Sequence, residues 1–78
     1  MDAQKQFGKR LAALRKARGW SQEALALESG IARSYLGGVE RGQRNIALVN
    51  ICRLADALNL KPSVLLDFDG TVPVPPKP

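Results

Sequence analysis

Residues 20–42 read WSQEALALESGIARSYLGGVERG, and this stretch decides the fold. Ser21 stands before a run with helical apolar spacing, where a serine side chain can cap the first N–H groups of a helix. Glu23 lies in the first turn of that run, where the helix dipole favours an anion. Gly30 ends the run, because glycine readily adopts the left-handed conformation that follows a helix. A second helical run begins after Ile31, and two short helices joined by a glycine-containing turn are typical of a helix-turn-helix.

The second run, residues 34–42 (SYLGGVERG), is rich in glycine and admits two interpretations. A phosphate-binding loop needs a strand before the glycines and usually a Lys followed by Ser or Thr after them, and neither is present. The sequence therefore favours a helix, with Leu36 and Val39 facing the core. Gly37 and Gly38 are then expected on the outward side, where the missing side chains would let the backbone approach DNA closely. Relief of crowding against a neighbouring helix is an equally good reason for Gly37.

Apolar spacing predicts helices on both sides of this motif as well. The five predicted helices cover about residues 3–17, 22–29, 32–41, 46–60 and 61–66. Pro62 stands at the first position of the last one, where proline is well tolerated. We therefore predict an all-helical (all-α) domain over residues 1–66. Residues 67–78 carry four prolines among the last six positions, which predicts an extended or disordered tail.

The composition narrows the classes of function. The chain carries a net charge of +5, and residues 1–66 contain eleven Lys or Arg against five Asp or Glu. Such a basic domain indicates a polyanionic partner, most commonly nucleic acid, although solubility alone would also explain the charge. Histidine is absent and Cys52 is the only cysteine, so we expect no metal, no cofactor and no enzymatic activity. The lone cysteine fits a reducing cytoplasm, and we expect neither a membrane partner nor a small-molecule ligand.

Residues 20–42, together with NICRLADALNL at 50–60, resemble the lambda-repressor-like, or Xre-type, helix-turn-helix proteins. The resemblance covers about residues 5–66 and rests on Gln22, Leu25, Ala26, Gly30, Ile31, Leu36, Glu40 and Gly42. The stretch RSYLGGVERGQRN looks most like the small controller proteins of restriction-modification systems, although general regulators share much of it. The resemblance implies a compact five-helix domain in which the helix-turn-helix forms helices two and three. The second of these helices would enter the major groove of DNA.

The start of that helix carries the residues expected to read the base sequence. Arg33 could donate two hydrogen bonds to guanine, Ser34 could contact a base or a phosphate, and Tyr35 offers a hydroxyl and a ring edge. In the family, positions matching Arg33, Ser34 and Gly38 commonly face bases. Gly38 has no side chain with which to do so, which leaves that contact to the more distant Arg41 or Arg44.

Other residues are expected to contact the DNA backbone. They are Gln22, Gly38, Arg41, Arg44 and Asn45. Gln22 and Arg44 lie at or near helix starts, where N–H groups and the helix dipole attract phosphate. A local capping role is an alternative for Gln22, and an ordinary solvated charge is an alternative for Arg44.

Arg15 and Glu40 match a family pair that ties the first helix to the recognition helix. Removing one partner of a partly buried pair strands the charge of the other, so the resemblance implies a structural role for both. The alternative for Glu40 is an ordinary exposed helix charge.

One recognition helix reads few base pairs, so specificity normally requires a dimer on a pseudo-palindromic site. The residues expected to form the homodimer interface, together with part of the predicted helix over residues 46–60, are the apolar cluster Val64, Leu65, Leu66 and Phe68. Alternatively, Val64 and Leu65 cover the domain's own core. The expected partners are thus a double-stranded DNA operator, a second copy of the chain and, in regulation, RNA polymerase. A protein-interaction module such as an antitoxin is the alternative function, which the Pro-rich tail supports.

Overall fold

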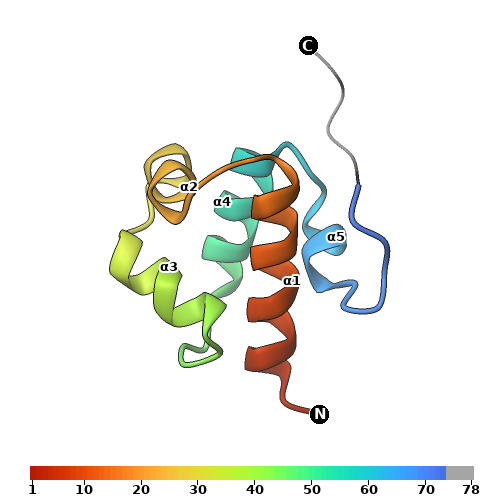
Figure 1. Ribbon diagram of the computed structural model, residues 1–78. Coiled ribbons are helices and arrows are strands. Elements are labelled where there is room, and N and C mark those ends of the chain that lie inside the picture. The colour runs from red at the N-terminus through yellow and green to blue at the C-terminus, as the bar shows by residue number, and fades with distance from the viewer. Residues whose placement is uncertain (74–78) are drawn as a thin grey trace.

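The computed structural model describes residues 1–73, and five helices make up its regular structure (Figure 1). They are α1 (Ala3–Ala17), α2 (Gln22–Ser29), α3 (Arg33–Glu40), α4 (Leu48–Leu58) and α5 (Pro62–Leu66). The predicted all-helical, five-helix fold is confirmed. The predicted bounds of α4 were too wide, because Asn59 takes a left-handed backbone conformation (φ 56°) that ends the helix. The end of the predicted tail, residues 74–78, lies outside the described residues.

Local capping signals define the helix-turn-helix. The side chain of Ser21 accepts a hydrogen bond from the backbone N–H of Ala24 at 3.0 Å, as its position before α2 predicted. Gly30 ends α2 in the left-handed conformation (φ 72°), and only glycine adopts this conformation readily. The predicted helix over residues 32–41 begins one residue later than expected, because Ala32 is the exposed residue that precedes it. The chain therefore turns sharply between α2 and α3.

Leucine side chains form most of the core. Those with almost no exposed surface, together with Val39, are Leu11, Leu14, Leu25, Leu36, Leu54, Leu58 and Leu65. Each such side chain contributes about 1.5–3 kcal/mol through burial, so the core rather than the helices themselves holds this small domain together. α1 packs against α3 and α5, α2 packs against α3 and α4, and α4 packs against α5. Only one side of α3 is thereby covered, and its first turn stays at the surface.

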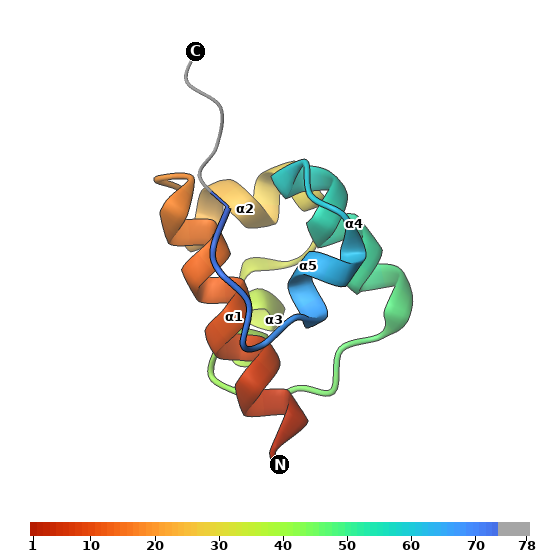
Figure 2. The same ribbon diagram turned by 90° about the vertical axis from the view of Figure 1, so that its right-hand side faces the viewer.

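The segment after α5 folds back along α1 (Figure 2). Arg10, which is only 6% exposed, holds it there. Its Nε donates to the carbonyl of Val64 at 2.9 Å, and its Nη1 and Nη2 donate to the carbonyls of Gly70 and Thr71, each at 3.0 Å. The folded part of the chain therefore extends beyond the predicted boundary at residue 66, as far as Thr71. The first residues of the predicted extended or disordered tail are thus held in place by Arg10, and the domain boundary itself stays a prediction.

Replacing Arg10 with methionine should release this segment. Methionine keeps an apolar stem but cannot donate to the three carbonyls, so we expect a loss of about 2 kcal/mol in the free energy of unfolding. Urea unfolding measures the loss, and faster hydrogen exchange at the amides of Phe68 and Gly70 locates it. The matched control is Lys9→Met, because the neighbouring Lys9 is exposed and its replacement should change stability by less than about 0.5 kcal/mol. Equal stability of the two variants would show that Arg10 does not hold the segment.

Candidate nucleic-acid interface

The first turn of α3 is one of the exposed parts of the helix-turn-helix. Arg33 and Ser34 are exposed, whereas Tyr35 is half-buried and packs against the core. Leu36, which follows them, is completely buried and anchors the helix. All three residues predicted to read bases are thus grouped at the N-terminal end of α3, which is the end that enters a major groove in proteins of this architecture. Base reading itself stays a prediction.

The ion pair implied by the family resemblance is present and joins α1 to the last turn of α3. Arg15 donates from Nε and Nη2 to the two carboxylate oxygens of Glu40, each at 2.8 Å. Only 10% of the Arg15 side chain and 6% of the Glu40 side chain are exposed. Arg15 also donates to the carbonyl of Trp20 at 2.8 Å. The hydrogen bonds to Glu40 raise the pKa of the Arg15 guanidinium above its ordinary value, so Arg15 stays charged at every physiological pH.

Gln22 belongs to the same network. Its Nε2 donates to Oε1 of Glu40 at 3.0 Å, so the side chain is tied to the ion pair. The capping of α2, which was the alternative role for Gln22, is performed by Ser21. Gln22 therefore lies half-buried at the junction of α1, α2 and α3. A contact from Gln22 to the DNA backbone stays a prediction.

Gly8, for which the sequence suggested no role, lets α1 approach α3 very closely. A β carbon on Gly8 would lie 2.5 Å from the carbonyl oxygens of both Val39 and Glu40, which is far inside van der Waals contact. Gly42, just past α3, has a left-handed backbone (φ 76°), and a β carbon there would lie 2.6 Å from Cγ of Lys5. The end of α3 is thus clamped to α1 by close backbone packing as well as by the ion pair.

Gly37 and Gly38 were expected on the outward side of α3. Both face away from the apolar core, but both are buried. The space beside Gly37 is closed by the ends of the Arg41 and Gln22 side chains, and the space beside Gly38 is closed by the side chain of Arg44. Long polar side chains therefore cover the glycines. The side chain of Arg44 lies over Gly38 in this structure, and a contact of Gly38 with the DNA backbone stays a prediction.

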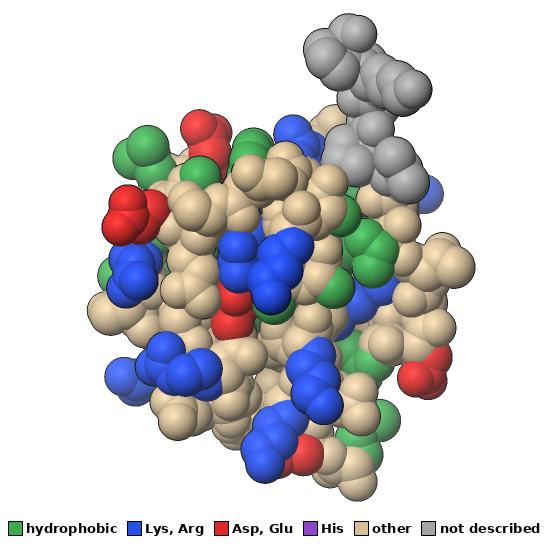
Figure 3. Space-filling model, viewed as in Figure 1, with side chains coloured by type: hydrophobic (Ala, Val, Ile, Leu, Met, Phe, Trp, Pro, Cys, Tyr) green, Lys and Arg blue, Asp and Glu red, His purple; other side chains and the backbone are tan. Residues whose placement is uncertain are grey.

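Positive side chains gather around α3. Arg33, Arg41 and Arg44 are all exposed, and Figure 3 shows Lys and Arg side chains over α3 and over the N-terminal half of α1 on the same face. Glu23 is the acidic partner of Arg33, but their closest N···O distance is 3.9 Å and both side chains are largely exposed. Such a pair is weak, so the arginine stays free to find another acceptor. The positive charge on this face, around α3, is suited to binding a polyanion such as DNA.

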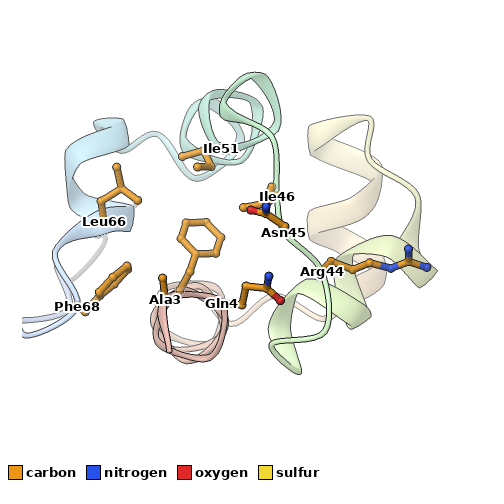
Figure 4. Close-up of a pocket in the computed structure, with 9 residues that line it drawn as sticks. Ala3, Gln4, Arg44, Asn45, Ile46, Ile51, Leu66 and Phe68 are labelled. Carbon is orange, nitrogen blue, oxygen red and sulfur yellow. The ribbon is translucent and has the colours of Figure 1, made fainter. Parts of the chain in front are cut away.

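The residues predicted to form a dimer interface do not all lie at the surface. Leu65 has no exposed surface and belongs to the core, so its assignment to the interface was wrong. Val64 is half-buried, and its carbonyl is bound by Arg10. Leu66 is 48% exposed, and with Phe68 it lines an apolar groove between the start of α1, the start of α4 and the segment after α5 (Figure 4). Two large exposed side chains on the first turn of α4 were not singled out from the sequence, namely Leu48 and Val49.

Within residues 1–73, no helix combines the length and the apolar character needed to cross a membrane. In the same part of the chain, no cluster of three or more His, Cys, Asp or Glu side chains is arranged to hold a metal ion.

Two short helices meet at the Gly30 turn, and the second exposes its first turn within a group of arginines. This is the arrangement of a helix-turn-helix DNA-binding protein. The chain belongs to the helix-turn-helix family HTH_3, whose model matches residues 11–65. The resemblance noted in the sequence is confirmed. The protein is a DNA-binding transcriptional regulator and not an enzyme.

Several relatives are control proteins. The chain is 41% identical over 63 residues to the control protein C.BamHI of Bacillus amyloliquefaciens. The matched residues are 80% of this chain and 78% of the relative. It is 39% identical over 70 residues to C.SmaI of Serratia marcescens, over 90% of this chain and 83% of the relative. The crystal structure of the restriction-modification controller protein C.AhdI from Aeromonas hydrophila superimposes with a TM-score of 0.78 at 60% identity, over 80% of this chain and 94% of that chain.

Proposed function

We propose that this protein is the controller protein of a restriction-modification system, which binds a pseudo-palindromic operator as a homodimer in the cytoplasm. The observation that carries the proposal is the exposed first turn of α3, with Arg33 and Ser34 in solvent on a helix that Arg15 and Glu40 hold rigidly to α1. The similarity to proteins described as restriction-modification controllers supports the choice among regulators.

In the proposed complex, the N-terminal end of α3 enters the major groove. The guanidinium of Arg33 donates to O6 and N7 of a guanine, while Ser34 and Tyr35 contact neighbouring bases. Arg41, Arg44 and Asn45 flank the groove and contact phosphates, with Gln22 at the start of α2 on the other side. These backbone contacts fix the register of the protein on the duplex, and they supply most of the salt-dependent affinity.

The proposed dimer uses the exposed apolar side chains near the C-terminal end of the domain. Leu66 at the end of α5 would pair with its counterpart, together with the half-buried Phe68 that follows the helix and the exposed Leu48 and Val49 on α4, which packs against α5. A domain of this size has a small core, so covering such side chains also stabilises the fold. A two-fold dimer presents two copies of α3 to half-sites about 34 Å apart, which is one turn of DNA.

Selection of binding sites from random duplexes, repeated at several salt concentrations, tests the proposal. A controller protein should select a site with two-fold symmetry, and its affinity should fall steeply as salt increases. An antitoxin-like protein-interaction module should show no preferred sequence at any salt concentration. That outcome would refute the proposed function.

Arg33→Ala and Arg44→Ala should weaken DNA binding in different ways. Loss of Arg33 should remove about 1–3 kcal/mol of discrimination, roughly 5- to 150-fold, at one base position in each half-site. Loss of Arg44 should instead weaken binding to all sequences alike and lower the slope of log affinity against log salt by about 1 for each phosphate that is no longer neutralised. Titration of the selected operator and of single-base variants measures both effects. Identical profiles for the two variants would contradict this division of roles.

A further inference from the structure

Gly38 lies inside α3, where its presence needs an explanation. Glycine in the interior of a helix lowers stability by about 1 kcal/mol relative to alanine. The glycines of residues 1–73 with a left-handed backbone are Gly19, Gly30 and Gly42, so the backbone of Gly38 is one that any residue could adopt. The reason for glycine must therefore be the space that a side chain would fill.

That space is occupied by Arg44. A β carbon on Gly38 would lie 2.9 Å from Cγ of Arg44, 3.4 Å from its Nε and 3.7 Å from its Cδ, so the arginine side chain lies lengthwise over the glycine. The guanidinium carbon of Arg44 is 6.0 Å from the centre of the Tyr35 ring, one turn earlier on α3. Figure 4 shows the same side chain directed away from the apolar groove and across α3.

The backbone brings Arg44 to this place. The N–H of Gln43 donates to the carbonyl of Gly38 at 2.9 Å, which folds the start of the loop after α3 back onto the helix. The next residue, Arg44, can then lay its side chain over the glycine. The positively charged guanidinium of Arg44 therefore lies at the same end of α3 as Tyr35.

The neighbouring Gly37 differs in the atoms that cover it. A β carbon there would approach Nη1 of Arg41 at 3.1 Å and Oε1 of Gln22 at 3.5 Å. The closer of these atoms is the far end of a flexible side chain of the same helical segment, and it can move aside. A substitution at Gly38 meets the stem of Arg44 instead.

We propose that Gly38 is a positioning residue for Arg44. Because Gly38 has no side chain, the side chain of Arg44 can pack against α3 at this position, which we call the seat. The guanidinium of Arg44, which comes from the loop after α3, then lies beside Tyr35 at the DNA-facing end of the helix. The inference rests on the proposed function and adds to it the reason why this helix contains glycine at position 38. It also replaces the expectation that Gly38 itself approaches the DNA backbone.

The test compares Gly38→Ala with Gly37→Ala in the full-length protein. Gly38→Ala should leave the melting temperature unchanged or raise it, because alanine favours the helix, yet it should weaken operator binding about tenfold, the usual scale for one charge-assisted hydrogen bond. The slope of log affinity against log salt should fall by about 1, as expected when the protein neutralises one phosphate fewer. Gly37→Ala should lower affinity by no more than about threefold, because the end of the Arg41 side chain that it displaces can take another rotamer and still reach a phosphate.

A double-mutant cycle decides whether the effect passes through Arg44. In an Arg44→Ala background, Gly38→Ala should cause no further loss of affinity, because the displaced side chain is already gone. The proposal is overturned if Gly38→Ala binds like the original protein with an unchanged salt slope. It is equally overturned if the alanine costs the same affinity with and without Arg44, since the methyl group would then obstruct DNA directly.

A measurement without DNA separates this inference from the proposed function. In the free protein, nuclear Overhauser effects should connect the α protons of Gly38 with the side-chain protons of Arg44, and their absence would refute the seat. If these effects are observed but the original protein binds no DNA duplex, the proposed regulator function and the DNA role of Arg44 both fail. The packing of Arg44 over Gly38 would then be a feature of the fold only.

Discussion

Replacing Glu40 with alanine is expected to lower the free energy of unfolding by about 3–5 kcal/mol, the usual cost of removing one partner from a buried ion pair. The guanidinium of Arg15 would lose its carboxylate partner, and keep only the carbonyl of Trp20, at a site where its side chain is only 10% exposed. Gln22 would lose its acceptor as well. Urea unfolding followed by circular dichroism, at one fixed protein concentration because a dimer would add its own stabilisation, measures the change.

Glu23→Ala is the matched control for this variant. It removes the same side chain from a helix, but the Glu23 carboxylate is 81% exposed and lies 3.9 Å from its nearest cation. Its loss should change stability by less than about 1 kcal/mol. Replacing both partners, as in Arg15→Met with Glu40→Leu, should recover part of the loss, because no buried charge is then stranded. If Glu40→Ala and Glu23→Ala unfold at the same urea concentration, the pair does not hold α3 to α1.

Gly8→Ala should also destabilise the protein, although the same substitution in a free helix is favourable by about 1 kcal/mol. The added methyl group would meet the carbonyl oxygens of Val39 and Glu40 at 2.5 Å, and backbone atoms cannot rotate away as a side chain does. α1 and α3 would have to separate, at a cost of about 3 kcal/mol, the upper part of the usual range for overpacking. Thermal and urea unfolding measure the loss.

Gly37→Ala serves as the control for Gly8→Ala, because its nearest neighbour is the flexible end of Arg41. We expect the two alanine variants to differ in sign, with Gly37→Ala neutral or up to about 1 kcal/mol more stable. If Gly8→Ala were as stable as the original protein, the close approach of α1 to the end of α3 could not be a constraint on the fold.

Most of the helices were predictable because their signals are local. Ser21 before α2, Gly30 after it and Pro62 at the start of α5 act on the few residues beside them, so their effect can be predicted without knowing the fold. Ser34 lies opposite the face of α3 that buries Leu36 and Val39, as the periodicity predicts, and Arg33 is exposed because it is the first residue of the helix, directly after the turn.

The errors concern residues whose surroundings come from distant parts of the chain. Leu65 was assigned to an interface, with a core position as the alternative, and it lies in the core. Residues 67–71 were expected to be extended or disordered, and Arg10 holds the end of this segment through Gly70 and Thr71. Apolar character at the C-terminal end is equally compatible with a core and with an interface. Only the packing of α5 against α1 and α4 separates the two.

The amino-acid order thus specifies the five helices, the turn between α2 and α3, and a first turn of α3 rich in hydrogen-bond donors, because each depends on contacts within a few residues. Three features depend on the tertiary structure. Arg10 binds carbonyls of the C-terminal segment, which are 54 to 61 positions away in the sequence. Gly8 lets α1 approach the end of α3 closely, and the side chain of Arg44 covers Gly38. The residues next to an arginine or a glycine in the sequence do not reveal such a role. The role of an arginine depends on which carbonyl or carboxylate groups lie near its guanidinium in the folded protein, and the role of a glycine depends on which atoms pack beside it.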